Sequence, residues 1–308
     1  MSADTASGST APVAAGPSAR RDRLNLLALV SLIAVTAVWG GTFVVVKDVT
    51  RAASPMDFLA VRFLMAAAVL MALRPSRVLR LNRRQWRHGV LLGLALGVAY
   101  IAQTYGQQYT AASTSGFITG MSVVFTPVIA GLLLRHRISA TVLWAVGIAT
   151  AGLGAMSLHG FAMGPGEGLT LLCALFLALH ITGLSEWSVA EDAYALTVVQ
   201  LGVVGLLCLA LGAPDGMDLP ADGSFWISVA GLAVVATSAG YLIQTWAQAR
   251  LPASVVAIVL TLEPVFAGIF GVLVDHDALT ARIVVGAALV VGAMCLAEFR
   301  SATPAPSP

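Results

Sequence analysis

Long apolar runs alternate with short polar connections along almost the whole chain. Ten of these runs come close to the length of about 20 mostly apolar residues that a transmembrane helix needs. The predicted spans cover residues 26–46, 57–73, 88–107, 112–134, 140–158, 168–187, 194–212, 225–249, 253–274 and 281–299. The pattern therefore predicts an all-α integral membrane protein with ten transmembrane helices.

The second half of the chain repeats the pattern of the first. Gln103-Thr104-Tyr105 returns as Gln244-Thr245-Trp246 after 141 residues, and Gly154-Ala155-Met156 returns as Gly292-Ala293-Met294 after 138. Because each half holds five spans, the second copy enters the bilayer upside down, as in many secondary transporters built from inverted repeats. We expect two inverted five-helix repeats around a central cavity. The predicted organisation is a disordered cytoplasmic tail at 1–24, a first repeat at 25–160, a second repeat at 164–299 and a cytoplasmic tail at 300–308.

Composition agrees with a membrane fold. Of the 308 residues, 58% are hydrophobic and 10% are charged, and the mean hydropathy is +0.89, whereas soluble domains carry about 25% charged residues. The connections are too short for a separate soluble domain. The net charge of +2 is small and its basic residues lie at the ends of the spans, so we expect no nucleic-acid partner.

Basic residues fix the expected orientation, because cytoplasmic loops carry an excess of lysine and arginine. With the N-terminus in the cytoplasm, thirteen basic residues fall inside and three outside, and Arg62 falls within a span. The inside set is Arg20, Arg21, Arg23, Arg74, Arg77, Arg80, Arg83, Arg84, Arg87, Arg135, Arg137, Arg250 and Arg300, and the outside set is Lys47, Arg51 and Arg282. We expect a multi-pass protein of the plasma (inner) membrane with both termini cytoplasmic.

Small residues predict where helices approach closely, since lipid gives apolar helices no hydrophobic reason to associate. Gly89, Gly93 and Gly97 stand four apart in the third span, and Gly116 and Gly120 do so in the fourth. Weaker versions of such a face are formed by Ala151 with Ala155 and by Ala288 with Gly292. The three cysteines, Cys173, Cys208 and Cys295, also lie within spans, where a reduced and buried side chain is expected rather than a disulfide or a metal site.

Glu263 is the first candidate functional residue, because an ionisable group inside the bilayer is costly and marks function by default. It lies ten residues into the ninth span, about 15 Å at 1.5 Å per residue. Pro264 follows it, so the carbonyl of Leu260 lacks its amide partner and the helix can kink. The pair is a candidate site for a proton or a substrate amine. The alternative is a neutral carboxyl group hydrogen-bonded to a neighbouring helix.

Further polar residues within spans are candidates for cavity lining. Arg62 lies near the outer end of the second span, where it either faces the cavity or extends to the surface. His180 corresponds to Trp39 at an offset of 141, which suggests cavity lining in both halves, although an interhelical hydrogen bond explains the histidine as well. Gln103 and Gln244 correspond at the same offset, and inversion would put them on opposite sides of the membrane as polar rims around a central cavity.

Several motifs together resemble the EamA-type permeases of the drug/metabolite transporter superfamily. They are Trp39-Gly40-Gly41-Thr42-Phe43, Arg62-Phe63, the stretch 109–127 and Leu262-Glu263-Pro264. The resemblance covers residues 26–299 and implies export of small metabolites or amino acids by alternating access, with the Trp39 region, Arg62, Pro127 and Glu263 at family motif positions. Arg135-His136-Arg137 and Asp275-His276-Asp277 depart from the family pattern, in which Gly-Glu-Arg usually follows the fourth span.

The remaining function classes are separated by what the sequence lacks. A P-loop needs Gly-Lys-Ser/Thr, and the single lysine, Lys47, follows Val46. An intramembrane hydrolase would need a nucleophile motif or a metal pair, and the five histidines lie on different segments. We therefore expect a secondary transporter of a small molecule, with no cofactor and with protons as the candidate coupling ion. A channel or a non-transporting scaffold is the alternative, and a homodimer remains one option for the assembly.

Overall fold

Helices account for nearly all of the chain that the computed structural model describes, which is residues 17–133, 140–159, 162–187, 193–248, 250–251, 256 and 259–301. The first elements are α1 Pro17–Ala52, α2 Pro55–Leu73, α3 Pro75–Leu79, α4 Arg83–Gly106, α5 Ala112–Leu133 and α6 Ala140–Ser157, followed by the two-residue strands β1 Leu158–His159 and β2 Ala162–Met163. The later elements are α7 Pro165–Trp187, α8 Ala193–Gly212, the 3-10 turn η1 Ala213–Asp215, α9 Gly223–Gly231, the π-helical segment η2 Leu232–Ala239, α10 Gly240–Gln248, α12 Leu262–Leu273 and α13 Ala281–Ser301. All three cysteines are free, and Cys173 and Cys208 are buried as predicted.

Seven helical stretches in the described part of the chain are long and apolar enough to cross a membrane. They are Arg23–Ala52, Pro55–Leu73, Arg83–Gly106, Ala112–Leu133, Pro165–Trp187, Ala193–Gly212 and the continuous run Gly223–Gln248. The other three predicted spans coincide with shorter apolar helices, at Leu143–Gly152, Leu262–Leu273 and Ala281–Leu296. The all-helical membrane fold is confirmed, and the count of ten spanning helices stays a prediction.

Helix ends are set by caps that suit a chain turning back into lipid. Ser54 accepts a hydrogen bond from the Asp57 amide, and Pro55 occupies the first helical position of α2, where its missing N–H costs nothing. Asn82 and Gln85 form a reciprocal capping box at the start of α4. Polar side chains thus satisfy part of the backbone amides that the first turns of α2 and α4 leave open.

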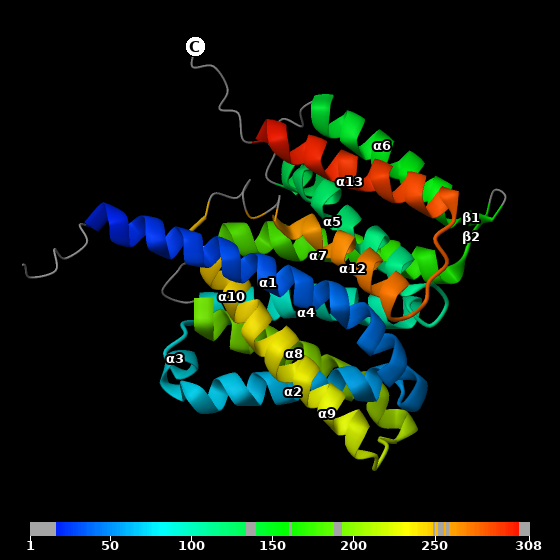
Figure 1. Cartoon of the computed structure of the whole chain (residues 1–308). Helices are drawn as coiled ribbons and strands as arrows, with labels where there is room; N and C mark the ends of the chain where they lie inside the picture. Colours follow the sequence, from blue (N-terminus) through cyan, green and yellow to red (C-terminus); the bar gives the residue numbers. More distant parts are fainter. Residues whose placement is uncertain are drawn as a thin grey trace, which may run out of the picture.

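The most extensive helix contacts join the two halves of the chain. α6 packs on α13, α2 on α8, α5 on α12, α4 on both α7 and α8, and α1 on α12 (Figure 1). Within one half, contacts such as α1 with α2 are slight. The halves therefore interleave across a shared interface, and neither forms a separate bundle.

Glycine makes two of these crossings tight, as the spacing predicted. A Cβ atom built on Gly89, Gly93 or Gly97 of α4 would lie 2.7–2.8 Å from side-chain atoms of α8. One on Gly116 of α5 would overlap the Cβ of Ala267, and one on Gly120 would lie 2.9 Å from Pro264 Cγ. Real Cβ atoms do not approach so closely, so these crossings exist because the residues are glycine.

The prediction that α13 packs closely through a face at Ala288 and Gly292 is wrong. A Cβ atom at Gly292 would meet nothing within 4 Å, although its helix α13 packs closely on α6. The close approach uses another glycine, Gly152, where an added Cβ would lie 2.7 Å from the carbonyl oxygen of Gly286. The four-residue spacing correctly indicated that these helices tolerate close packing but not which side of α13 faces inward.

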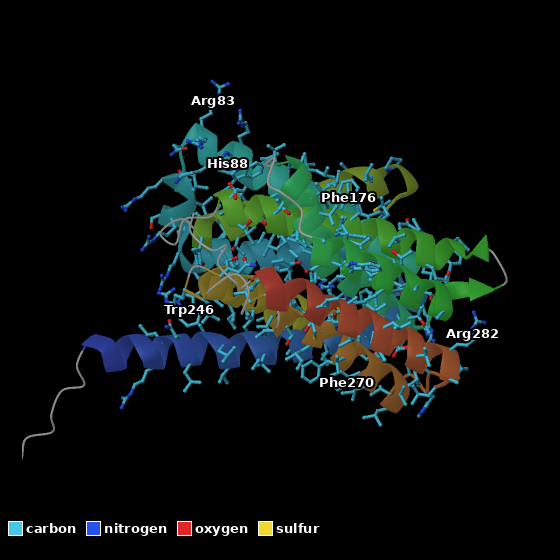
Figure 2. The ribbon with its side chains drawn as sticks, turned by 90° about the horizontal axis from the view of Figure 1, so that it is seen from above. Arg83, His88, Phe176, Trp246, Phe270 and Arg282 are labelled. Atoms are coloured by element: carbon cyan, nitrogen blue, oxygen red, sulfur yellow. The ribbon has the colours of Figure 1, made fainter. Side chains whose placement is uncertain are left out.

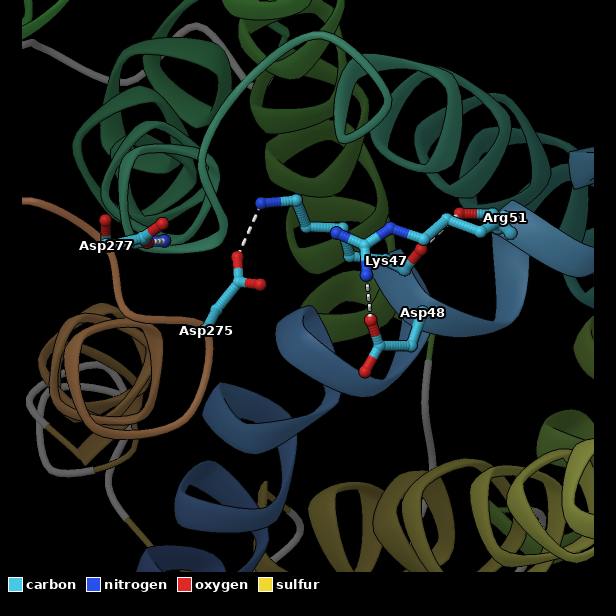
Figure 3. Close-up of polar contacts among 7 residues, drawn as sticks. Lys47, Asp48, Arg51, Asp275 and Asp277 are labelled. Carbon is cyan, nitrogen blue, oxygen red and sulfur yellow. Dashed lines mark hydrogen bonds and ion pairs between the residues drawn. The ribbon is translucent and has the colours of Figure 1, made fainter.

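Ion pairs gather at one end of the bundle, where α1, α5 and the α12–α13 connection meet (Figure 3). Lys47 Nζ lies 2.5 Å from Asp275 Oδ2, and Arg51 pairs with Asp48 at 2.6 Å. The Asp277 carboxylate accepts a hydrogen bond from the Ser113 amide in the first turn of α5, at 2.9 Å. The departure from the family pattern at Asp275-His276-Asp277 thus ties this connection to α1 and α5, whereas Arg135-His136-Arg137 lies outside the described residues.

Gly116→Ala tests the α5–α12 crossing. The new methyl group would overlap Ala267, and overpacking of this kind costs about 1–3 kcal/mol, so we expect a lower apparent melting temperature for the purified protein in detergent. Gly292→Ala is the matched control, because its methyl group enters open space. Equal melting temperatures for the two variants would contradict the crossing.

Candidate functional site

A cavity of about 60 Å³ lies between the two halves, with walls from α1, α4, α5, α7, α10 and α12. Its polar and aromatic lining residues are Trp39, Thr42, Phe43, Tyr100, Gln103, Ser122, His180, Tyr241, Gln244 and Glu263, together with Cys173. Five of the six substrate or proton candidates predicted from sequence therefore meet at one place, and Arg62 is the exception. Since ligand pockets usually have volumes of about 300–1,000 Å³, the cavity in this conformation is too small for a metabolite.

Glu263 brings the one carboxylate to this cavity. The helical residues Val259 and Leu260 are followed by a turn at Thr261, and α12 begins at Leu262, so Glu263 lies in the first turn of α12. A helix N-terminus stabilises negative charge. No hydrogen bond to this carboxylate occurs among the described residues, which disfavours the alternative of a carboxyl group held by a neighbouring helix. Glu263 is thus aimed at the cavity with its acceptor capacity unused.

The two predicted kink prolines differ in setting. Pro127 lies inside α5, which continues as a helix to Leu133. Pro264 follows Glu263 in the first turn of α12, just after the break at Thr261. The surrounding sequences, Thr126-Pro127-Val128-Ile129-Ala130-Gly131 and Glu263-Pro264-Val265-Phe266-Ala267-Gly268, match at an offset of 137. Where the second half carries a carboxylate, the first carries Thr126, whose hydroxyl donates to the Ser122 carbonyl at 2.7 Å.

Two tyrosines that the sequence interpretation missed join the halves at the cavity. The Tyr241 hydroxyl donates to the Tyr100 hydroxyl at 2.9 Å, across 141 residues. Tyr241 also lies against Trp39, with ring centroids 5.4 Å apart, and against His180, at 6.4 Å. The signal was present, because each tyrosine precedes Gln103 or Gln244 by three residues and the pair repeats at the same offset of 141.

Arg62 neither lines the cavity nor reaches the surface. Its side chain is 2% exposed, and its Nε donates to Thr237 Oγ1 at 2.8 Å. The guanidinium lies 5.3 Å from the ring centre of Tyr100 and 5.4 Å from that of Phe63, within the range of cation–π attraction. Among the described residues no carboxylate pairs with it. Arg62 is therefore enclosed behind Tyr100 and held by rings and a hydroxyl.

The π-helical segment η2 is where the first half binds the second. Trp39 Nε1 donates to the Ala236 carbonyl at 2.8 Å, Arg62 donates to Thr237, and Ser238 donates to the Ala66 carbonyl at 3.2 Å. Thr237 and Ser238 also donate to carbonyls five residues earlier, at 2.9 and 2.8 Å. Short π-helical segments within α-helices are common at functional sites, and this one presents three successive residues to α1 and α2.

The remaining polar groups of the cavity are paired unequally. Gln103 Nε2 donates to Thr119 at 3.2 Å, and His180 Nε2 lies 2.6 Å from Gln200 Oε1 on α8. Both interpretations of His180 are therefore satisfied, since it lines the cavity and bonds to another helix. Gln244 differs, because its carbonyl oxygen is buried without a partner. Within the described part of the chain no three His, Cys, Asp or Glu side chains converge as metal ligands would.

Comparison with known proteins agrees with this geometry. The family model described as "EamA-like transporter family" matches the chain twice, over residues 26–158 and 164–299. An "Uncharacterized transporter" of Archaeoglobus fulgidus is 29% identical over 90% of this chain and 87% of its own length, and "Uncharacterized transporter YoaV" of Bacillus subtilis is 22% identical over 85% and 93%. A crystal structure described only as that of a protein superposes with a TM-score of 0.66 at 16% identity, over 89% of this chain and 99% of that chain, and this likeness concerns the fold alone.

Thr237→Val tests the attachment of Arg62 to η2. Valine keeps the shape of threonine but removes the oxygen that accepts from Arg62 Nε, and an unpaired buried donor costs about 1–3 kcal/mol. We expect a lower apparent melting temperature in detergent. Thr150→Val on α6 is the control, because the Thr150 hydroxyl is exposed and bonds only to the Val146 carbonyl; a loss as large for Thr150→Val would contradict the role given to Thr237.

Proposed function

Since the chain belongs to the EamA-like transporter family, we propose that it is a secondary active transporter that exports small metabolites, amino acids or drug-like compounds by alternating access. Family membership and the apolar helices establish a multi-pass membrane transporter at the family level, and they support the expectation that it is not an enzyme. The observation that carries the proposal is the cavity, whose polar residues come from both halves of the chain.

We propose that the halves are inverted repeats, over residues 25–160 and 164–299. Let α1, α2, α4, α5 and α6 correspond to α7, α8, α9–η2–α10, α12 and α13. Exchange of the halves then converts the α4–α7 contact into α10–α1, α5–α7 into α12–α1, and α4–α8 into η2–α2, all of which occur. The contacts α6–α13, α2–α8 and α5–α12 convert into themselves. A two-fold relation between the halves explains why the same packing appears twice.

Alternating access follows from this relation as a mechanism. Two halves of like structure and opposite direction give two conformations of comparable energy, one open to each side. The Tyr100–Tyr241 hydrogen bond and the contacts of η2 lie on the interface that must rearrange. Because the cavity is smaller than a metabolite, substrate entry requires these helices to separate.

Charge supports an orientation with both termini in the cytoplasm of a cell whose plasma (inner) membrane holds the protein. One end of the bundle carries the exposed arginines Arg74, Arg77, Arg80, Arg83, Arg84 and Arg87. Arg282 marks the other end (Figure 2), where Lys47 and Arg51 pair with aspartates and Arg282 donates to the Ala155 carbonyl. The excess of basic residues therefore lies on one side, as is typical of cytoplasmic loops.

Cysteine labelling tests the topology. In a background in which Cys173, Cys208 and Cys295 are alanine, we expect an impermeant maleimide added to intact cells to label Gln108→Cys and to label Arg250→Cys only after permeabilisation. The two positions follow spans that run in opposite directions in the inverted arrangement. Labelling of both variants from the same side would overturn the inverted repeat.

Transport itself is tested by counterflow in proteoliposomes. Metabolites in the medium of cells with and without the gene are compared, and the compound that accumulates outside is loaded into the vesicles. A carrier gives saturable uptake of labelled compound that rises with unlabelled compound on the far side. A flux that rises linearly with concentration and lacks trans-stimulation would indicate a channel and overturn the proposal.

Glu263→Gln tests proton coupling. The amide keeps the size of the side chain and removes its titratable proton, so we expect transport by the variant to lose the pH dependence of the unaltered protein. Glu186→Gln is the control. Glu186 is exposed at the end of α7, so this substitution removes the same charge at a position away from the cavity. A pH profile that is unchanged in Glu263→Gln would remove Glu263 from this role.

A further inference from the structure

The cavity has one ionisable acid, and when it is ionised the cavity carries a single negative charge. Among the lining residues Glu263 is the single acidic side chain, and no lysine or arginine is present. Arg62, the nearest candidate for a balancing cation, is turned toward Thr237 and enclosed by Phe58, Phe63 and Tyr100. A ligand therefore meets a carboxylate with no cation beside it.

Three hydrogen-bond donors of the cavity are engaged with protein in this conformation. Trp39 Nε1 donates to the Ala236 carbonyl, Tyr241 donates to Tyr100, and Gln103 donates to Thr119. The N–H group of His180 is also engaged with protein. The Gln200 amide nitrogen donates to the Leu196 carbonyl, which turns Gln200 Oε1 toward His180, so Nε2 carries the proton and a neutral ring leaves Nδ1 as an acceptor.

The acceptors, in contrast, are left open. The Glu263 carboxylate has no donor among the described residues, and the Gln244 carbonyl oxygen, on a side chain that is 4% exposed, is buried without a partner. An unsatisfied acceptor in a low-dielectric site is costly. The group that would satisfy both is a donor that also carries positive charge.

We propose that the substrate bound in this cavity is an arylalkylammonium ion that lacks a carboxylate. This inference rests on the proposed function and narrows its substrate class. The ammonium group donates to Glu263 and Gln244, and the aromatic part lies among Trp39, Phe43 and Tyr241, whose rings also attract cations. The ligand supplies the charge and the donors that the cavity lacks.

An amino acid of the same skeleton fits less well. Its carboxylate would enter a site that already holds Glu263 and has no lysine or arginine among its lining residues. Recruiting Arg62 would break its bond to Thr237 and remove it from three aromatic rings. The cavity thus discriminates against a second negative charge through an unpaired like charge, which is specificity by repulsion.

The test is equilibrium binding to the purified full-length protein in lipid nanodiscs, which needs no transport. Tyramine is compared with tyrosine, which adds the carboxylate, with 4-ethylphenol, which removes the amine, and with N,N,N-trimethyltyramine, which keeps the charge and removes the N–H donors. We expect tyramine to bind at least about tenfold more tightly than the first two and several-fold more tightly than the third. Tyrosine binding as tightly as tyramine, or no binding of tyramine, would overturn the proposal.

Substitutions test whether the affinity for tyramine depends on Glu263. We expect Glu263→Gln to weaken tyramine by at least about tenfold and to reduce its advantage over 4-ethylphenol, with Glu186→Gln unchanged. Tyramine affinity that is unaltered in a folded Glu263→Gln protein overturns the proposal. Counterflow distinguishes failure of the proposed function from failure of the proposed substrate class. Selective tyramine binding without saturable exchange would contradict the transporter function and support the substrate class. Saturable exchange of tyrosine without binding of tyramine would support the transporter function and contradict the substrate class.

Discussion

Inside a bilayer no water is available to hydrogen-bond a polar group, and this constraint governs where each polar side chain of the protein lies. Thr50, Thr170 and Thr197 each donate to a carbonyl one turn earlier on their own helix. Arg62 and Trp39 find oxygens on η2. Five buried side-chain oxygens of the described residues have no protein partner, on Gln107, Ser115, Thr182, Gln244 and Gln248. Of these five, Gln244 lines the cavity that also holds Glu263.

Two kinds of contact join the halves, and they differ in what movement they permit. The glycine face of α4 on α8 and the overlap of Gly116 with Ala267 bring backbones together, and such surfaces slide or pivot poorly because nothing between them can yield. The Tyr100–Tyr241 bond and the contacts on η2 depend on single hydrogen bonds, which exchange partners at little cost. Motion between the halves is therefore expected to leave the glycine crossings intact and to break the single hydrogen bonds.

The sequence predicted how deep each polar residue lies along its helix. It did not predict which side of each helix faces the interior. The apolar runs and the polar residues within them identified five residues of the cavity, because an ionisable or amide group at mid-span has few other places to go. Arg62 was missed as an enclosed group, since both expected outcomes placed its charge in a polar medium and neither considered three aromatic rings and Thr237. No residue pattern predicted the π-helical segment η2, which contacts α1 and α2.

The two halves share a fold, but their functional residues differ. Thr126 occupies the position that Glu263 holds in the other half, and the Lys47–Asp275 pair ties α1 to the α12–α13 connection at one end only among the described residues. In the proposed inverted-repeat arrangement, the symmetry of the scaffold allows two opposite conformations, and a single carboxylate and an ion pair at one end make them unequal in energy. A difference of only 1.4 kcal/mol changes their ratio about tenfold. The residues that break the repeat therefore bias the populations of the two conformations, whereas the driving gradient sets the direction of transport.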